Sequence, residues 1–307
     1  MSINGICISA SETSEFRFIE KLILKELPEC TIIPFSNVLV TPELMDEVDY
    51  IFTVGGDGSV AWLVGAYYNT FENVDKLKPI VPVIRPTSIG YFRQLSMSPP
   101  EAFLNGLKRI IEKDYTIQNR TILETTINGR KIVAVNEITF FCEPHLGKYK
   151  ILVENHPNYE IITETMADGA MIATSMGSTA WSLSHQGHVS LCEDSLELIF
   201  VGGIHSSANF TLPRKKVRID LELKNPTVTK ESIFAYNEER ERLGLEKDQN
   251  ASKTLGIVYG PRVIVDGKIQ SFGDKSIEVN PFRSVPMLVL DKETVAEKAR
   301  KLTKIHI

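Results

Sequence analysis

A short apolar, β-branched run that stops at a glycine-rich turn constrains the fold of this chain more than any other segment. Residues 50–54 read Tyr-Ile-Phe-Thr-Val, residues 55–58 read Gly-Gly-Asp-Gly, and an apolar helical pattern begins directly afterwards. This order predicts a buried strand that passes through a tight turn into a helix. Glycines let backbone N–H groups approach a ligand closely, and a helix N-terminus favours anionic groups.

The carboxylate of Asp57 adds negative charge to a turn that otherwise suits phosphate. A carboxylate fits such a site if it shares Mg²⁺ with the phosphate or if it takes a proton from a hydroxyl. Both roles indicate phosphoryl transfer. Two other interpretations stay open. Gly56, Gly58 and Ala61 also fit a loose dinucleotide-binding fingerprint, with Asp75 at a tolerable distance for the ribose acid. The segment also fits a purely structural turn in which Asp57 caps the helix.

Length and composition limit the class of protein. The 307 residues can bury a large core and suggest two domains. The net charge of −5 gives no positive field that would recruit nucleic acid or an anionic membrane. The four cysteines are scattered, the first residues do not form a signal peptide, and no apolar run is long enough to span a bilayer. We therefore expect a soluble cytoplasmic protein without a nucleic-acid or membrane partner.

Strand and helix patterns alternate in the first third of the chain. Strands are predicted at 3–8, 31–33, 50–54 and 80–84, and helices at 15–27, 60–68 and 98–113, the last with Ser98 as a candidate cap. Such alternation favours a parallel sheet covered by helices.

From Tyr115 onwards most segments alternate with period two and meet at Asx-Gly pairs. Hairpins are predicted at Asn128-Gly129, Asp168-Gly169 and Asp266-Gly267, and a half-buried antiparallel strand at 217–223. We predict an α/β N-terminal domain with a parallel sheet at 1–115 and a β-rich C-terminal domain at 116–285. A terminal segment, 286–307, is expected to return to the first domain and to contain a helix at 292–302. The charged stretch 225–256 is interpreted as a surface helix or insertion.

Three further groups of polar residues have both a functional and a structural interpretation. Asn136-Glu137 ends an apolar run and suits either hydroxyl or amide recognition, or a solvent-facing edge strand. Residues 174–184, dense in hydroxyls around one glycine, suit phosphate or ribose oxygens, or an ordinary capped helix. The side chains of Cys142, His145, His185, His188 and Cys192 are of the types that bind zinc. Their spacings match no known zinc-binding signature.

Taken in order, these motifs resemble those of the NAD kinase family. The series is Gly-Gly-Asp-Gly at 55–58, Ile-Gly-Tyr-Phe at 89–92, Asn-Glu at 136–137, Asp-Gly at 168–169 and the hydroxyl-rich 174–184. The first motif is shared with a wider group that includes diacylglycerol-type lipid kinases and 6-phosphofructokinases. The ordered set, from 50 to about 184, is similar to NAD kinases specifically, and the Asp266-Gly267 hairpin extends the resemblance.

The resemblance implies a dinucleotide site between the two domains and ATP-dependent transfer of a phosphoryl group to the adenosine-ribose 2′-hydroxyl of NAD. It implies Mg²⁺ with ATP, no direct protein ligand to the metal, and a homodimer or homotetramer.

By motif, Asp57 is the catalytic carboxylate and Gly55 and Gly56 belong to the phosphate turn. Asp168 is expected at the nicotinamide end and Glu137 near ribose hydroxyls. The implied NAD-binding residues are Gly58, Asn136, Glu137, Asp168, Thr179, Ala180, Trp181, Ser182, Leu183 and Ser184. Tyr149, Met166 and Lys268 match weaker contacts of the family.

The chain departs from the family pattern within these motifs. Family members usually show Thr-Pro-Thr-Gly-Ser where this chain has Thr-Ser-Met-Gly-Ser at 174–178, and Ser-Ala-Gly-Gly-Pro where it has Ser-His-Gln-Gly-His at 184–188. Trp181 stands where Tyr is common. These departures bear on the acceptor more than on the reaction type. The alternatives are a related kinase acting on a lipid or sugar hydroxyl, a non-catalytic dinucleotide sensor and, least favoured, a Rossmann dehydrogenase.

Overall fold

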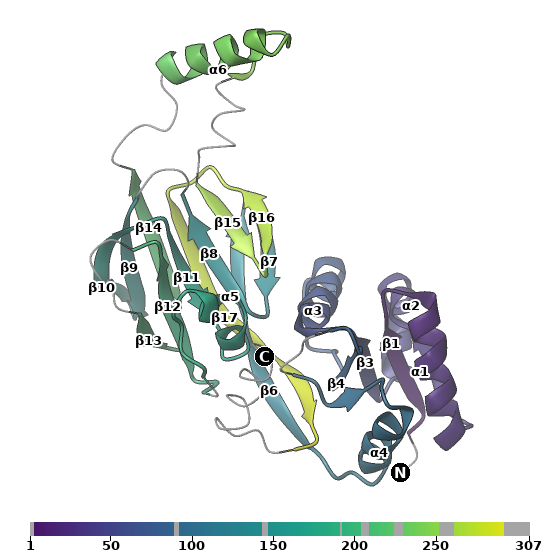
Figure 1. Cartoon of the computed structure of the whole chain (residues 1–307). Coiled ribbons are helices and arrows are strands. Elements are labelled where there is room, and N and C mark those ends of the chain that lie inside the picture. Colours follow the sequence, from purple (N-terminus) through teal and green to yellow (C-terminus); the bar gives the residue numbers. More distant parts are fainter. Residues whose placement is uncertain are drawn as a thin grey trace.

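The computed structural model describes residues 3–88, 92–142, 147–190, 192–203, 209–223, 230–251 and 261–291. An α/β part and a β-rich part lie end to end and share one continuous sheet, while one helix stands apart from both (Figure 1). The predicted fold class is confirmed.

Four parallel strands in the order β2-β1-β3-β4 form the centre of the α/β part. They are β1 (Gly5–Ser9), β2 (Thr31–Pro34), β3 (Tyr50–Val54) and β4 (Ile80–Ile84), and the two-residue β5 (Leu95–Ser96) pairs with β4. The residues of β1, β3 and β4 are buried throughout, as continuous apolar runs predict for strands covered on both faces.

Helices cover both faces of this parallel sheet (Figure 1). Apolar side chains of α1 (Thr13–Glu26) and α4 (Pro100–Ile111) pack on one face. Those of α2 (Phe35–Val40), the 3₁₀ helix η1 (Pro42–Glu47) and α3 (Asp57–Phe71) pack on the other. Each helix buries an apolar stripe set by its 3.6-residue period.

The strand order creates a switch point between β1 and β3. The chain leaves β1 towards β2 on one side and leaves β3 towards β4 on the other side. In open α/β sheets the crevice outside the carboxyl ends of such strands is where ligands bind. The Gly-Gly-Asp-Gly turn, which follows β3, lies at this edge.

The β-rich part consists of two packed sheets. Strands that continue the large sheet are β6 (Thr116–Ile127), β7 (Arg130–Ala134), β9 (Gly147–Asn155), β10 (Asn158–Ala167), β14 (Val217–Leu223) and β17 (Ser276–Val289). The second sheet, ordered β13-β12-β11-β8-β15-β16, contains β8 (Glu137–Phe141), β11 (Gly169–Ala173), β12 (Ser195–Val201), β13 (Phe210–Pro213), β15 (Arg262–Val265) and β16 (Lys268–Ser271). Side chains from both sheets, Phe140 and Ile219 among them, fill one core.

The hairpins at Asn128-Gly129 and Asp266-Gly267 are confirmed. They join β6 to β7 and β15 to β16, and both residues of each pair have the positive φ that a tight hairpin turn requires.

The hairpin predicted at Asp168-Gly169 is wrong. There β10 ends in the large sheet and β11 begins in the second sheet, where it pairs with β8 and β12. Gly169 is required by space rather than by turn geometry, since a Cβ on it would lie 2.6 Å from the ring of Phe141. The cap predicted at Ser98 is also wrong, because the residue before α4 is Pro99 and no side chain caps the helix.

β17 connects the two parts of the molecule. It pairs antiparallel with β6 along most of its length, and Met287 then pairs with Ile80 of β4 in parallel. The domain limits at 115 and 285 stay predictions, and the helix expected at 292–302 lies outside the described residues.

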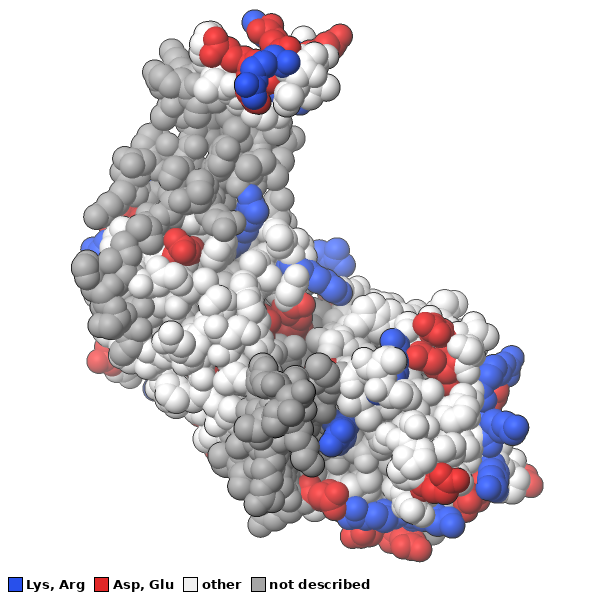
Figure 2. Space-filling model, in the orientation of Figure 1, with Lys and Arg blue, Asp and Glu red and all other residues white. Residues whose placement is uncertain are grey.

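The charged insertion is a helix, α6 (Lys230–Arg242), as the sequence predicted. It stands away from the two sheets (Figure 1). Figure 2 shows acidic and basic side chains mixed over the face in view, without a broad area of one sign. Within the described part of the chain, no helix has the length and apolarity needed to cross a membrane.

Candidate functional site

The phosphate turn, residues 55–58, passes directly from β3 into α3. Gly55 has φ +147, and a Cβ there would lie 2.9 Å from Cβ of Ser59, so the turn needs glycine for both conformation and space. Asp57 is the first residue of α3 and is half-buried. Its Oδ1 accepts a hydrogen bond of 3.1 Å from the backbone N–H of Phe92. The carboxylate is thus held at a helix N-terminus, where the helix dipole favours negative charge.

A second corner forms where β7 meets β8, at Asn136-Glu137. The carboxylate of Asp266 accepts backbone N–H hydrogen bonds from Val135, Asn136 and Glu137 at 2.9, 2.8 and 3.2 Å. The backbone N–H of Asp266 in turn donates to the carbonyl of Glu137 at 3.1 Å. These contacts bind the hairpin turn of β15–β16 to the corner and fix its backbone.

The side chains at this corner are buried but incompletely paired. Asn136 is 8% exposed and Glu137 is 3% exposed. Within the described residues, Oδ1 of Asn136 and Oε2 of Glu137 are buried without a hydrogen-bond partner. An unpaired buried polar group costs about 1–3 kcal/mol, so such atoms suit a ligand that satisfies them. The interpretation of Asn136-Glu137 as a solvent-facing edge is therefore wrong.

Burial changes the protonation of this corner. It raises the pKa of Glu137 from 4.5 to about 8, and the negative charge of Asp266 adds to the effect. Burial also raises the pKa of Asp266, although the three backbone N–H groups and Lys268 act in the opposite direction. These surroundings favour the neutral carboxylic acid form of Glu137, which can donate one hydrogen bond and accept others.

A cavity of about 480 Å³ lies between α3 and the strands β7, β15 and β16, and we call it the interdomain cavity. Gly58 and Trp62 line it from the α/β part, and Asn136, Asp266 and Lys268 line it from the β-rich part. The phosphate turn and the Asn136-Glu137 corner, 78 residues apart by their numbers in the sequence (58 and 136), thus border one space.

The hydroxyl-rich segment packs behind this corner. Thr174 donates through Oγ1 to the carbonyl of Val135 at 2.7 Å, and its N–H donates to the carbonyl of Asn136 at 2.9 Å. A Cβ on Gly177 would lie 2.1 Å from the carbonyl oxygen of Asn136, so only glycine fits there. The segment forms two short helical turns rather than one longer helix, η2 (Gly177–Thr179) and α5 (Trp181–Ser184).

Many of its hydroxyls are used internally. Oγ of Ser178 donates to the carbonyl of Ser175, and Oγ of Ser182 donates to the carbonyl of Gly177. Thr179 and Ser182 are buried, Ala180, Trp181 and Leu183 are half-buried, and Ser184 is exposed. Of these residues, Ser184 offers the most accessible hydroxyl.

Asp168 lies at the other end of the second sheet. Since β8 and β11 are five residues long and pair in register, Asp168 lies roughly 17 Å from the Asn136-Glu137 corner at about 3.3 Å per residue. Its carboxylate lies against Gly202, which lines a separate cavity of about 350 Å³ together with Ser184 and Asn209. Among the expected NAD-binding residues, Gly58 and Asn136 therefore line the interdomain cavity, and Ser184 lines this separate one.

The weaker candidates divide in the same way. Lys268 lines the interdomain cavity. Tyr149 is fully buried in the core of the β-rich part and donates its hydroxyl to the carbonyl of Asp168 at 2.8 Å. Met166 is half-buried on β10 opposite Lys148. In one copy of the chain, only Lys268 of these three lies beside Asn136.

The zinc site considered from the sequence does not form in the part of the chain that the structure describes. No group of three or more His, Cys, Asp or Glu side chains suited to a metal occurs there, and all four cysteines are free. His145 lies outside the described residues. His185 instead packs edge-to-face on Trp181 at 5.1 Å between ring centroids, and burial lowers its pKa. Asp75, the alternative ribose acid, forms an exposed ion pair with Arg283 at 2.7 Å.

The sequence analysis did not identify the role of two residues at the site. Asp266 was identified only as a turn residue, whereas its carboxylate organises the Asn136-Glu137 corner. Arg85, directly after β4, places a cation beside Gly55. Its position after a predicted parallel strand was the one available signal, because carboxyl ends of neighbouring strands meet at one edge.

Together, the fold and the site define a two-part α/β and β-rich protein with a glycine-rich turn facing a cavity between the parts. No family model matches the chain. Solved structures share the fold. Yeast NADH kinase complexed with NADH matches 99% of this chain and 88% of its own, with a TM-score of 0.70 and 18% identity. An NAD kinase from Archaeoglobus fulgidus in complex with ATP matches 97% of this chain and 99% of its own, with a TM-score of 0.63 and 20% identity.

Curated relatives match a part of the sequence. The NAD kinase of Chloroherpeton thalassium is 29% identical over 148 residues, 47% of either chain. The NAD kinase of Methanothermobacter thermautotrophicus is 30% identical over 144 residues, which are 47% of this chain and 46% of that protein. The chain thus spans about half the length of the curated relatives that it matches.

Proposed function

We propose that the chain is an NAD kinase that transfers a phosphoryl group from ATP to the adenosine-ribose 2′-hydroxyl of NAD. The observation that carries the proposal is the interdomain cavity, where the turn bearing Asp57 faces Asn136 and Lys268 of the other part. The similarity to proteins named NAD kinase supports it. NAD would occupy this cavity, with its ribose hydroxyls near Asn136 and Glu137.

In the proposed reaction Asp57 accepts the proton of the 2′-hydroxyl. The bond from the terminal phosphorus of ATP to its bridging oxygen breaks, a bond from phosphorus to the 2′-oxygen forms, and ADP leaves with the electron pair. The transition state is loose, so positioning and charge compensation contribute most of the acceleration. Base catalysis of this kind contributes about 10²–10⁴-fold.

The corner around Glu137 would hold the acceptor in place. The neutral carboxyl of Glu137 and the amide of Asn136 together offer donors and acceptors to ribose hydroxyls, as the unpaired Oδ1 and Oε2 require. Within Thr179 to Ser184, the half-buried or exposed residues would extend the binding surface from behind the corner, and the buried Thr179 and Ser182 would support it. Asp168 and Ser184, at the second cavity, are the residues that we expect at the nicotinamide end.

A divalent cation, Mg²⁺, is the cofactor that we propose for the donor. The described residues fit this role only loosely: no cage of three ligands is present, and Asp57 is the carboxylate nearest the phosphate turn. Mg²⁺ commonly binds through substrate phosphates with one or two carboxylates, and it supplies charge neutralisation there. We further propose a cytoplasmic homodimer or homotetramer without a nucleic-acid or membrane partner.

The test is NADP formation from NAD and Mg²⁺-ATP by the native chain and by Asp57→Asn. We expect turnover to fall about 10²–10⁴-fold in the variant while NAD binding is kept. The control is Asp75→Asn, which removes only an exposed ion pair and should leave the rate unchanged. If the native chain binds NAD but forms no NADP, the chain is a sensor or a kinase for another acceptor, and a screen of sugar and lipid alcohols separates the two.

A further inference from the structure

Arg85 places a partly buried positive charge at the phosphate turn. Its Nη2 donates a hydrogen bond of 2.6 Å to Oγ of Ser11, and its Nε lies 2.7 Å from Oε1 of Glu15. Nη2 would also lie 3.7 Å from a Cβ on Gly55. The side chain is 27% exposed. The guanidinium therefore bridges the end of β4, the loop after β1 and the glycine turn.

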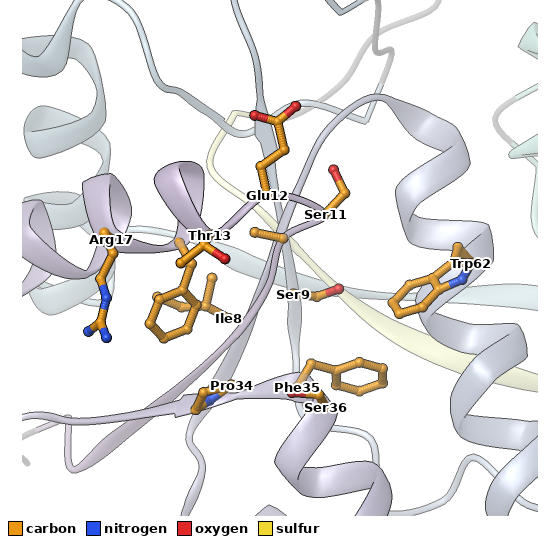
Figure 3. Close-up of a pocket in the computed structure, with 12 residues that line it drawn as sticks. Ile8, Ser9, Ser11, Glu12, Thr13, Arg17, Pro34, Phe35, Ser36 and Trp62 are labelled. Carbon is orange, nitrogen blue, oxygen red and sulfur yellow. The ribbon is translucent and has the colours of Figure 1, made fainter.

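The loop that Arg85 holds lines a third cavity, of about 330 Å³, at the carboxyl ends of β1 and β2. We call it the Trp62 cavity. Figure 3 shows the rings of Trp62 and Phe35 bordering this space, with the hydroxyl of Ser9 pointing toward Trp62 and that of Ser11 pointing away from the two rings. Thr13 also lines the cavity. The two rings meet edge-to-face with centroids 6.0 Å apart, yet the Trp62 side chain stays 49% exposed.

The lining combines aromatic rings and hydroxyls with one side chain of each charge, Glu12 and Arg17. A fixed, exposed aromatic face suits stacking by a planar base, and neighbouring hydroxyls suit a sugar. Trp62 also lines the interdomain cavity, so it stands between the two spaces on α3, five residues after Asp57. A ligand in the Trp62 cavity can therefore extend towards the phosphate turn.

We infer that the Trp62 cavity takes the nucleoside of the phosphoryl donor and that Arg85 binds the donor's phosphates. This inference rests on the proposed function. A polyphosphate that reaches Gly55 meets the negative charge of Asp57, so a neighbouring cation is needed to offset the repulsion. Arg85 supplies it with a rigid fork of donors, which matches phosphate oxygens. Nη2 and Nε of Arg85 contact Ser11 and Glu15, and Nη1 is the donor that we expect to reach the phosphates.

The pairing of Arg85 with Glu15 and Ser11 orients the fork. The side chain of Glu15 is 12% exposed, and Glu15 belongs to the first turn of α1. Its carboxylate is therefore held in place by the helix and its packing. Arg85 is thus held before any ligand arrives, and little side-chain freedom is lost on binding. The donor would lie with its base against Trp62, its phosphates past Ser11 and Arg85, and its terminal phosphorus at Gly55–Gly58.

The experiment is calorimetric titration of the full chain with Mg²⁺-ATP, with inorganic tripolyphosphate and with NAD. In Arg85→Gln we expect the Kd for Mg²⁺-ATP and for tripolyphosphate to rise about 10- to 100-fold, the effect of losing charge-assisted hydrogen bonds. The Kd for NAD should stay within about twofold of the native value, because Arg85 lines no part of the interdomain cavity. Arg283→Ala, which removes another ion-paired arginine on the surface, is the matched control.

A double variant separates the loss of phosphate binding from damage to the fold. Arg85→Gln leaves Glu15 without its partner, so the pair Glu15→Gln with Arg85→Gln keeps the site neutral and should show the same loss of phosphate affinity. Unchanged ATP affinity in both variants, equal losses for ATP and NAD, or no ATP binding by the native chain would each overturn the inference. ATP binding that depends on Arg85 without NADP formation would support the inference and overturn NAD as the acceptor.

Discussion

Replacing Glu137 with Gln is expected to remove a loss of stability that the raised pKa of Glu137 predicts for the native chain between about pH 4.5 and about pH 8. Burial raises the pKa of Glu137 across this range, so the folded chain keeps a proton that the unfolded chain releases. The stability that this proton supplies is complete below about pH 4.5, declines as the pH rises, and is gone above about pH 8. At about 1.4 kcal/mol per pKa unit, this contribution should fall by on the order of 5 kcal/mol over the range. Gln holds no titrating proton, so the variant should lack this contribution and keep only the pH dependence of the other shifted groups, Asp266 and His185 among them.

Urea unfolding at half-unit pH steps from 5 to 8.5 measures this difference. The matched control is Glu164→Gln, since Glu164 on β10 is paired with Lys148 on β9 and its pKa is lowered, which places its titration below the range. The control should follow the native curve. Parallel curves for the native chain and Glu137→Gln would refute the reasoning, because they would mean that Glu137 is ionised in the folded chain at neutral pH.

Two glycine substitutions test the backbone of the site. Gly177→Ala places a Cβ 2.1 Å from the carbonyl oxygen of Asn136, so we expect a loss of about 1–3 kcal/mol and weaker NAD binding, read by urea unfolding and NAD titration. Gly55→Ala puts a side chain at φ +147 and against Ser59, so we expect a loss of about 1–3 kcal/mol and weaker ATP binding by the same two measurements. Gly273→Ala, where no atom lies within 4 Å, should change neither property, and equal effects in all three would contradict both predictions.

Local turn chemistry explains which parts of the fold the sequence predicted. The pairs Asn128-Gly129 and Asp266-Gly267 form hairpins because both residues adopt positive φ and the flanking strands are adjacent in one sheet. Asp168-Gly169 has the same composition, but its backbone pairs with Val201 and Cys142, residues distant in sequence. Long-range pairing overrode local preference there, and no local signal distinguishes the two situations.

The site was predicted in part for the same physical reason. The positions of Gly55 and Asp57 follow from a strand, a turn and a helix that are contiguous in sequence. The roles of Asp266 and Arg85 depend on strands that meet only in the folded chain, Asp266 reaching residues 135–137 and Arg85 reaching Ser11 and Glu15. Such contacts have no periodicity or spacing that one sequence can show.

In the proposed reaction, the different surroundings of Asp57 and Glu137 favour Asp57 as the base. Asp57 is half-buried at a helix N-terminus and accepts a backbone N–H, surroundings that favour a carboxylate. Glu137 is buried beside the negative charge of Asp266, surroundings that favour a carboxylic acid. Two carboxyl groups whose environments separate them in this way take different roles.

We therefore expect Glu137→Gln, which preserves a neutral hydrogen-bonding group, to keep kcat within about tenfold of native, while Asp57→Asn loses about 10²–10⁴-fold. Steady-state rates of NADP formation measure both values. A larger fall in kcat for Glu137→Gln than for Asp57→Asn would indicate that Glu137 is the base. It would contradict the argument that burial keeps Glu137 neutral.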